Sequence, residues 1–271
     1  MSGISKCNCR YILCSDSRAN NFDTYKQPNF HIDYVIRRGA SIVTLQQETL
    51  QFLSSHTSSE EYLSVKICVG INDLLAKTQH KFGKEIELGT VSLNTIFDHF
   101  RLFRQSVKLL RPNTLLAFIT IPHFSFLGYI NFSLASNKLT QSKYTETELE
   151  NFQKHLNDKI NQINDFIINE NVTDISVLGR PLSVLWHKEI LHKHTNRSGR
   201  KRHNRQFVYS YHFSRLYDGL HAKSHVKRKW FRSLCYVFEK EFSRHAAIDD
   251  HLSDSSGFSD TVSLLETDSD S

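Results

Sequence analysis

Three residues whose types suit nucleophilic catalysis occur at two places in the sequence. Ser17 follows a short apolar run from Tyr11 to Cys14, and Asp218 lies three residues before His221. A serine hydroxyl attacks a carbonyl efficiently only when a base removes its proton, and a histidine oriented by a carboxylate is such a base. Ser17, Asp218 and His221 are therefore predicted to catalyse acyl transfer.

Such a reaction also needs hydrogen-bond donors for the negative charge that develops on the attacked carbonyl oxygen. Gly39 ends a second apolar run, and its missing side chain lets the backbone N–H approach a substrate closely. Asn72 follows a third run, which ends at Gly70, and its amide donates without ionising. The backbone N–H groups of Ser17 and Gly39 and the amide of Asn72 are predicted to form an oxyanion hole.

The Ser15-Asp16-Ser17 turn also has a simpler interpretation. Serine and aspartate are favoured at the N-caps of helices, and this explanation is the better one if the turn is considered alone. The catalytic interpretation depends on the matching residues further along the chain.

The elements that must position these residues alternate between strands and helices. Apolar runs predict strands at 11–14, 33–38, 62–69, 115–121 and 175–178. Three- and four-residue spacing predicts helices at 41–52, 93–110, 149–167 and 221–242. This alternation is typical of an α/β fold, with three layers and a mostly parallel, five-stranded, flavodoxin-like sheet. Ser17, Gly39 and Asn72 would then lie at one carboxyl edge of that sheet.

The ordered set of serine, glycine, asparagine and Asp-x-x-His resembles the SGNH hydrolases, also called GDSL-type esterases and lipases. The resemblance extends from residue 10 to about residue 242. It implies a serine esterase without a cofactor, with Ser17 as nucleophile and Asp218 and His221 completing a catalytic triad. It also implies oxyanion-hole roles for Gly39 and Asn72 and a small-molecule or lipid ester as substrate.

One position departs from the family pattern, because Ser15 stands where the family usually has glycine. Serine would be strained there, and activity reduced, if the backbone needed a positive φ. The Ser-Asp-Ser-Arg variant is similar to SGNH-like domains of mobile genetic elements and of uncharacterised invertebrate proteins. The alternative function is a non-catalytic module, similar to Oskar-type domains, that binds RNA or DNA through a basic surface.

The charge is distributed unevenly along the chain. Residues 246–271 contain seven acidic residues and no Lys or Arg, so a total net charge of +6 leaves +13 on residues 1–245. A strongly basic body favours binding to polyanions. We expect residues 1–245 to form one SGNH hydrolase-like domain and the Ser/Asp-rich residues 246–271 to be a disordered tail.

Two segments interrupt the alternation and are predicted to be insertions. The first, near 123–143, contains candidates for the wall of an acyl pocket, or alternatively for the core: His123, Phe124 and Phe126. The second, near 186–210, is basic and either binds nucleic acid or forms a solvated loop. Its candidate phosphate contacts are Lys193, Arg197, Arg200, Lys201, Arg202 and Arg205.

The remaining features concern location and metals. No apolar run approaches the roughly 20 residues of a membrane span, and the N-terminus lacks the apolar core of a secretion signal. The five cysteines are scattered and odd in number. These features favour an intracellular protein, cytoplasmic or nuclear. The histidines near residue 190 show no known zinc-ligand spacing, so no metal is expected.

Overall fold

A computed structural model describes residues 9–26, 28, 30–58, 62–80, 83–136, 144–172, 186–192, 206–211 and 213–255 of the chain. For residues 9, 75–80, 83–90, 172, 186–192, 206–211 and 242–255 it describes the backbone alone.

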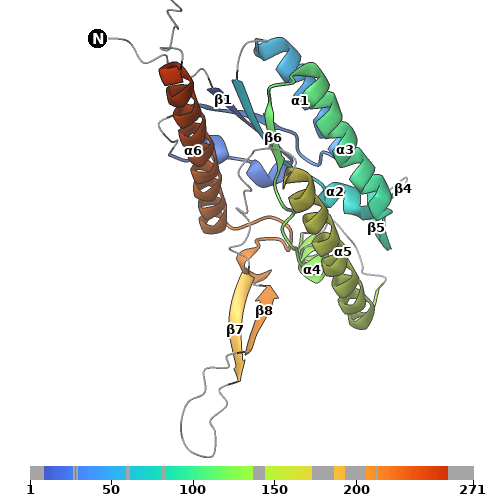
Figure 1. The fold of residues 1–271 in the computed structure, drawn as a ribbon. Coiled ribbons are helices and arrows are strands. Elements are labelled where there is room, and N and C mark those ends of the chain that lie inside the picture. The colour runs from blue at the N-terminus through green and yellow to red at the C-terminus, as the bar shows by residue number, and fades with distance from the viewer. Residues whose placement is uncertain are drawn as a thin grey trace, which may run out of the picture.

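The centre of the fold is a parallel sheet of four described strands (Figure 1). These strands are β1 (Cys9–Ser15), β2 (Ile32–Ile36), β3 (Tyr62–Cys68) and β6 (Leu115–Phe118), in the spatial order β2-β1-β3-β6. Every neighbouring pair is parallel. The predicted mostly parallel α/β fold is confirmed. The fifth strand predicted at 175–178 lies outside the described residues.

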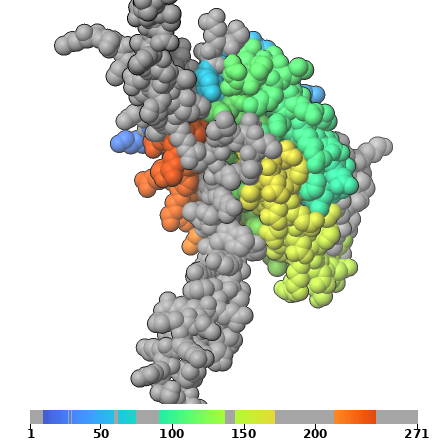
Figure 2. Space-filling view, in the orientation of Figure 1, coloured from blue at the N-terminus to red at the C-terminus, as the bar shows by residue number. Residues whose placement is uncertain are grey.

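Helices cover the sheet on both faces, which makes the three layers. The helices α1 (Ile42–His56), α3 (Leu93–Leu110) and α5 (Glu146–Val172) lie on one face, and α6 (Ser224–Ser255) lies on the other (Figure 1). The space-filling view shows α3 and α5 side by side (Figure 2). Ser41 caps α1, since its hydroxyl accepts a hydrogen bond from the Thr44 N–H.

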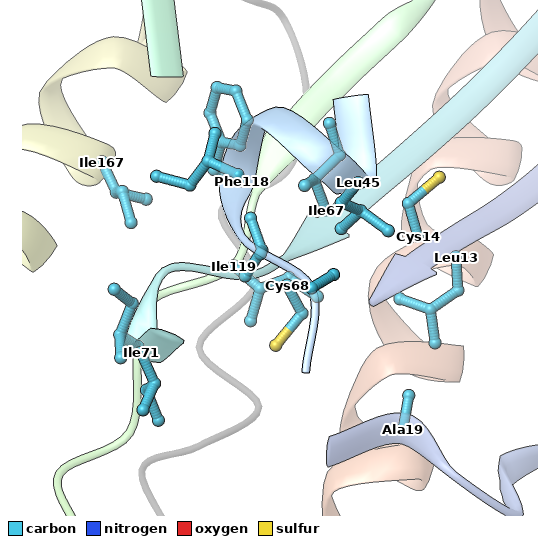
Figure 3. Packing of buried hydrophobic residues seen from close by; sticks show 14 of the residues in the cluster. Leu13, Cys14, Ala19, Leu45, Ile67, Cys68, Ile71, Phe118, Ile119 and Ile167 are labelled. Atoms are coloured by element: carbon cyan, nitrogen blue, oxygen red, sulfur yellow. The ribbon is translucent and has the colours of Figure 1, made fainter. Parts of the chain in front are cut away.

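Strand β1 is apolar on both sides because helices cover both of its faces. Tyr11 contacts Phe238 of α6, with ring centroids 5.1 Å apart. Cys14, on the other face, is fully buried beside Thr49 of α1. Side chains from β1, α1, β3 and β6 meet in one buried cluster (Figure 3). This packing holds the carboxyl end of β1, and therefore the turn at Ser17, against a rigid core.

A buried polar cluster joins α6 to the middle of the sheet. Lys66 of β3 is 1% exposed, and its ammonium donates to the Glu241 carboxylate of α6. The Ser64 hydroxyl donates to the other oxygen of Glu241 at 2.5 Å. A buried charge is strongly disfavoured without a partner, so this cluster specifies where α6 packs on the sheet.

Several elements differ from the predictions. Two antiparallel hairpins were not predicted, β4 (Leu75–His80) with β5 (Gly83–Thr90) and β7 (Trp186–His192) with β8 (Gln206–Tyr211). Helix α6 starts at Ser224, after His221, and extends to Ser255, past residue 246 where the predicted tail begins. The rest of that tail, 256–271, lies outside the described residues. Short elements complete the list: η1 (Ser17–Ala19), η2 (Phe22–Thr24), α2 (Ile71–Leu74), α4 (Phe126–Ala135) and η4 (Phe213–Arg215).

Candidate active site

Ser17 lies in a tight turn at the carboxyl end of β1. The chain leaves the strand at Ser15 and enters the single 3-10 turn η1, which Asp16 caps by accepting a hydrogen bond from the Arg18 N–H. The side chains of Asp16 and Arg18 also form a buried ion pair at 2.8 Å. The residues on either side of Ser17 are thus fixed, and the Ser17 side chain faces a cavity.

The structure brings Ser17 together with the distant Asp218–His221 turn. The Ser17 hydroxyl oxygen lies 2.8 Å from Nε2 of His221. On the other side of the ring, Nδ1 of His221 lies 2.7 Å from a carboxylate oxygen of Asp218. The three groups form one continuous chain of hydrogen bonds, in the order that proton transfer from a serine requires.

The Asp218 carboxylate is held as an anion. Its second oxygen accepts hydrogen bonds from the backbone N–H groups of Leu220 at 3.0 Å and His221 at 2.6 Å. Burial alone would raise the pKa of Asp218, but the hydrogen bonds from the ring and backbone of His221 and from Leu220 lower this pKa below its ordinary value. A charged carboxylate favours the His221 tautomer that has its proton on Nδ1 and an acceptor at Nε2.

The Asp218–His221 turn packs directly on the start of α4. Gly219 has φ of +79°, and a Cβ there would lie 2.3 Å from the backbone nitrogen of Tyr129. The Ser125 N–H donates to the Gly219 carbonyl at 2.7 Å. Only glycine fits this contact, because both the backbone angle and the space exclude a side chain. The segment at 123–136 thus supports the turn that carries His221.

The predicted oxyanion-hole residues follow β2 and β3 at the same sheet edge. Gly39 has φ of +69°, and no heavy atom of the described residues lies within 4 Å of the place where its Cβ would be. The Asn72 amide donates to the Ala40 carbonyl at 3.1 Å, which joins Asn72 to the loop that contains Gly39. Arg38, next to Gly39, lines the same cavity as Ser17. The structure therefore places the Gly39 loop beside both Asn72 and the Ser17 cavity.

Ser15 is not strained in this structure. Asn21 is the only non-glycine residue with positive φ among those described, so Ser15 has a backbone conformation open to any residue. Its buried hydroxyl donates to the Cys68 carbonyl at 3.2 Å. The loss of activity expected from strain at this position has no basis in the backbone geometry.

A cavity of about 730 Å³ opens at Ser17 and His221, a size typical of ligand sites. It is not lined by His123, Phe124 or Phe126, which are at most 3% exposed and lie in the core. The prediction that these three residues form the pocket wall is wrong. Phe132, from the same segment, lines the cavity instead, and its ring packs edge-on against Tyr217.

Other cavity residues were not predicted, because they belong to no motif that was recognised in the sequence. They are Asn20, Asn21, Tyr25, Arg38, Tyr217, Ala222, Lys223, Ser224 and Lys227. The clearest available signal was their closeness in sequence to the predicted catalytic residues, since most flank Ser17 or His221 within ten positions.

Three further points concern nucleic acids, metals and membranes. The six candidate phosphate contacts between Lys193 and Arg205 lie outside the described residues. Within the described part of the chain, no group of three or more His, Cys, Asp or Glu side chains is arranged to hold a metal ion. Among the described helices, none combines the length and the apolar character needed to cross a membrane.

Comparison with solved structures identifies the class of fold. The chain is similar to a GDSL-like lipase from Bacteroides thetaiotaomicron, with a TM-score of 0.50 and 10% identity over 90% of this chain and 91% of that one. It is also similar to a candidate acylhydrolase from Bacteroides fragilis, with a TM-score of 0.50 and 9% identity over 90% of each chain. No family model and no curated protein matches the sequence. The fold is therefore that of the GDSL-like hydrolases.

Proposed function

We propose that this protein is a serine esterase that hydrolyses a carboxylic ester through an acyl-enzyme intermediate. The observation that carries the proposal is the chain of hydrogen bonds from Ser17 through His221 to Asp218, with distances of 2.8 and 2.7 Å. The GDSL-like fold agrees with this activity, as do Ser17's place at the carboxyl edge of a parallel sheet and the adjoining cavity.

The reaction follows from these positions. His221 Nε2 takes the Ser17 proton as the serine oxygen bonds to the ester carbonyl carbon, and Asp218 stabilises the resulting imidazolium. The imidazolium then gives this proton to the departing alcohol oxygen, leaving an acyl group on Ser17. In the second half, His221 deprotonates a water that attacks the acyl group, and the proton returns to Ser17 as the acid leaves.

The charge on the carbonyl oxygen would be stabilised by the backbone N–H groups of Ser17 and Gly39 and by the Asn72 amide. The bond from Asn72 to the Ala40 carbonyl fixes the orientation of the amide before a substrate arrives. Asn72→Ala should therefore lower kcat about a hundredfold or more, the typical cost of one oxyanion donor, while Ser17 remains reactive. Steady-state kinetics with a simple acetyl ester measures this loss. An unchanged kcat would remove Asn72 from the proposed oxyanion hole.

The proposal is tested by covalent labelling with a fluorophosphonate probe, which reacts with activated serines. The folded protein should label at Ser17, located by mass spectrometry of the digested adduct. Ser17→Ala and His221→Ala should abolish labelling, because one removes the nucleophile and the other its base. Ser224→Ala is the matched control, since this serine lines the same cavity and the label at Ser17 should persist. Labelling that is absent, or that persists in Ser17→Ala, would contradict the esterase.

The predictions on nucleic-acid binding, on the similarity to mobile-element domains and on cellular location remain predictions. The alternative function, a non-catalytic module that binds RNA or DNA through a basic surface, stays a prediction, and its candidate contacts between Lys193 and Arg205 lie outside the described residues. The similarity to mobile-element domains and the intracellular location are likewise expectations from the sequence. The esterase is the function that the described residues support best.

A further inference from the structure

The cavity at Ser17 is lined by three cations, Arg38, Lys223 and Lys227. Among the described residues that line it, the only carboxylate is Asp218, which already holds the His221 ring. Among the described residues, none of the three cations forms an ion pair. The site therefore presents a net positive charge to whatever enters it.

A second cavity, of about 270 Å³, adjoins the first and has the same character. Its described lining residues are Thr24, Tyr25, Lys26, Arg228, Phe231 and Arg232, and none of these is a carboxylate. Tyr25 lines both cavities, so it marks the point where they meet. The guanidinium of Arg228 lies over the Tyr25 ring, 5.9 Å from its centroid. The positive charge thus continues from the nucleophile along the start of α6.

This arrangement is unfavourable for the protein alone. Arg228 and Arg232 are four residues apart on α6, a spacing at which like charges repel. Lys223 precedes the helix, and its carbonyl accepts a hydrogen bond from the Lys227 N–H at 3.0 Å, so the backbones of these two cations are also close. Lys227 also lies in the first turn of α6, near the positive end of the helix dipole. Partial burial lowers the pKa of Lys227, although Asp218 opposes this shift. A bound anion would relieve all three of these costs.

We propose that the ester cleaved at Ser17 carries a negatively charged group, a carboxylate, sulfate or phosphate, which Arg38, Lys223 and Lys227 bind. A substrate long enough to pass Tyr25 would place a further anionic group against Lys26, Arg228 and Arg232. The inference deepens the proposed function and rests on it, because it names the class of ester that the same site accepts.

A matched pair of acetyl esters tests this inference. One is 4-acetoxybenzenesulfonate, an anion, and the other is 4-acetoxybenzenesulfonamide, its neutral analogue. The kcat/KM of each ester is divided by its rate constant for hydrolysis by hydroxide, which removes the difference in chemical reactivity. We expect the normalised kcat/KM to favour the anion about tenfold or more at low ionic strength. This preference should decline as salt screens the charges.

Two double variants test which cations cause the preference for the anionic ester. Lys223→Gln with Lys227→Gln should reduce it to within about twofold, because two of the three cations at the cavity are lost. Lys229→Gln with Lys240→Gln removes the same charge from exposed positions of α6 that line neither cavity, and should preserve the preference. Thermal unfolding of all variants checks that they fold.

The outcomes separate the two proposals. If both esters are cleaved at equal normalised rates, the inference is overturned and the esterase stands. A preference that survives the loss of Lys223 and Lys227 would also overturn the inference, because the charge would act from elsewhere. If neither ester is cleaved and Ser17 does not label, the esterase fails and the inference fails with it.

Discussion

The loops that follow β1 and β6 begin at the same edge of the sheet but serve different purposes. After β1, the ion pair between Asp16 and Arg18 fixes the backbone while Ser17 faces the cavity. After β6, the side chains of Phe124 and Phe126 are buried in the core, at 1% and 0% exposure. A position at the carboxyl edge is therefore not enough to make a residue part of the site.

The difference comes from what covers each loop. Long polar side chains of α5 bind the backbone after β6: Asn164 accepts from the Ile121 N–H, and Gln153 accepts from the Phe126 N–H, both at 2.6 Å. Asn161 also forms a hydrogen bond with His123 at 3.0 Å. With its backbone polar groups satisfied by α5, this loop can be buried. In the loop after β1, Asp16 accepts hydrogen bonds from the backbone and side chain of Arg18, and the Asp16 N–H donates to the Cys68 carbonyl of β3. These contacts leave Ser17 facing the cavity.

The largest effect that this comparison predicts is a loss of stability at Phe126. Its ring is fully buried and packs edge-on against Phe152 at 4.9 Å, so Phe126→Ala should reduce the free energy of unfolding by about 3–5 kcal/mol. Urea denaturation measures this loss, with Leu109→Ala, at an 88% exposed position, as a control within about 0.5 kcal/mol of the wild type. The folded fraction should still label at Ser17. A smaller loss than in the control would refute the core assignment.

A smaller effect should appear as pH dependence at His123. Burial lowers the pKa of His123 to about 4, although Asn161 opposes this shift. Because the unfolded chain binds this proton near its ordinary pKa of 6.5, stability should be fully present above pH 6.5 and decline toward pH 4. The decline amounts to about 3 kcal/mol at most.

Urea denaturation at pH 7 and pH 4.5 measures this decline. The difference between the two pH values should shrink in His123→Gln and persist in His155→Gln, which alters an exposed histidine of α5. An equal difference in both variants would mean that His123 takes up its proton without leaving the core.

The smallest effect is expected at Ser15, in the loop that carries the nucleophile. Ser15→Gly removes a buried hydrogen bond and adds backbone freedom to a strand, so we expect a loss of about 1 kcal/mol of stability. Because Ser15 is unstrained, ester hydrolysis should not increase. Thermal unfolding and kcat measure the two effects. A severalfold rise in kcat would show that serine restrains the turn after all.

The sequence predicted the strands and helices in which the hydrophobic pattern of the residues matches their burial in the folded protein. In β1, the apolar residues of the predicted strand are buried in the structure. In α3, the buried residues recur at the three- and four-residue spacing that predicted the helix. Strands that are buried on both faces and amphipathic helices carry this signal in their own residues. The hairpins carry no comparable signal. In β4, the polar residues from Lys77 to His80 are consecutive, and in β5 the alternation of polar and apolar residues covers only Glu85 to Leu88.

The sequence by itself determined the residue types of the site and their order along the chain. The tertiary structure decided which of them meet: Ser17 and His221 are 204 residues apart, and their contact depends on α6 and α4 holding the Asp218–His221 turn against β1. It also decided that His123, Phe124 and Phe126 belong to the core, because α5 supplies the polar groups that allow their burial. Local spacing encodes which face of an element is apolar. Which distant side chain satisfies a buried backbone group is settled only when the elements pack.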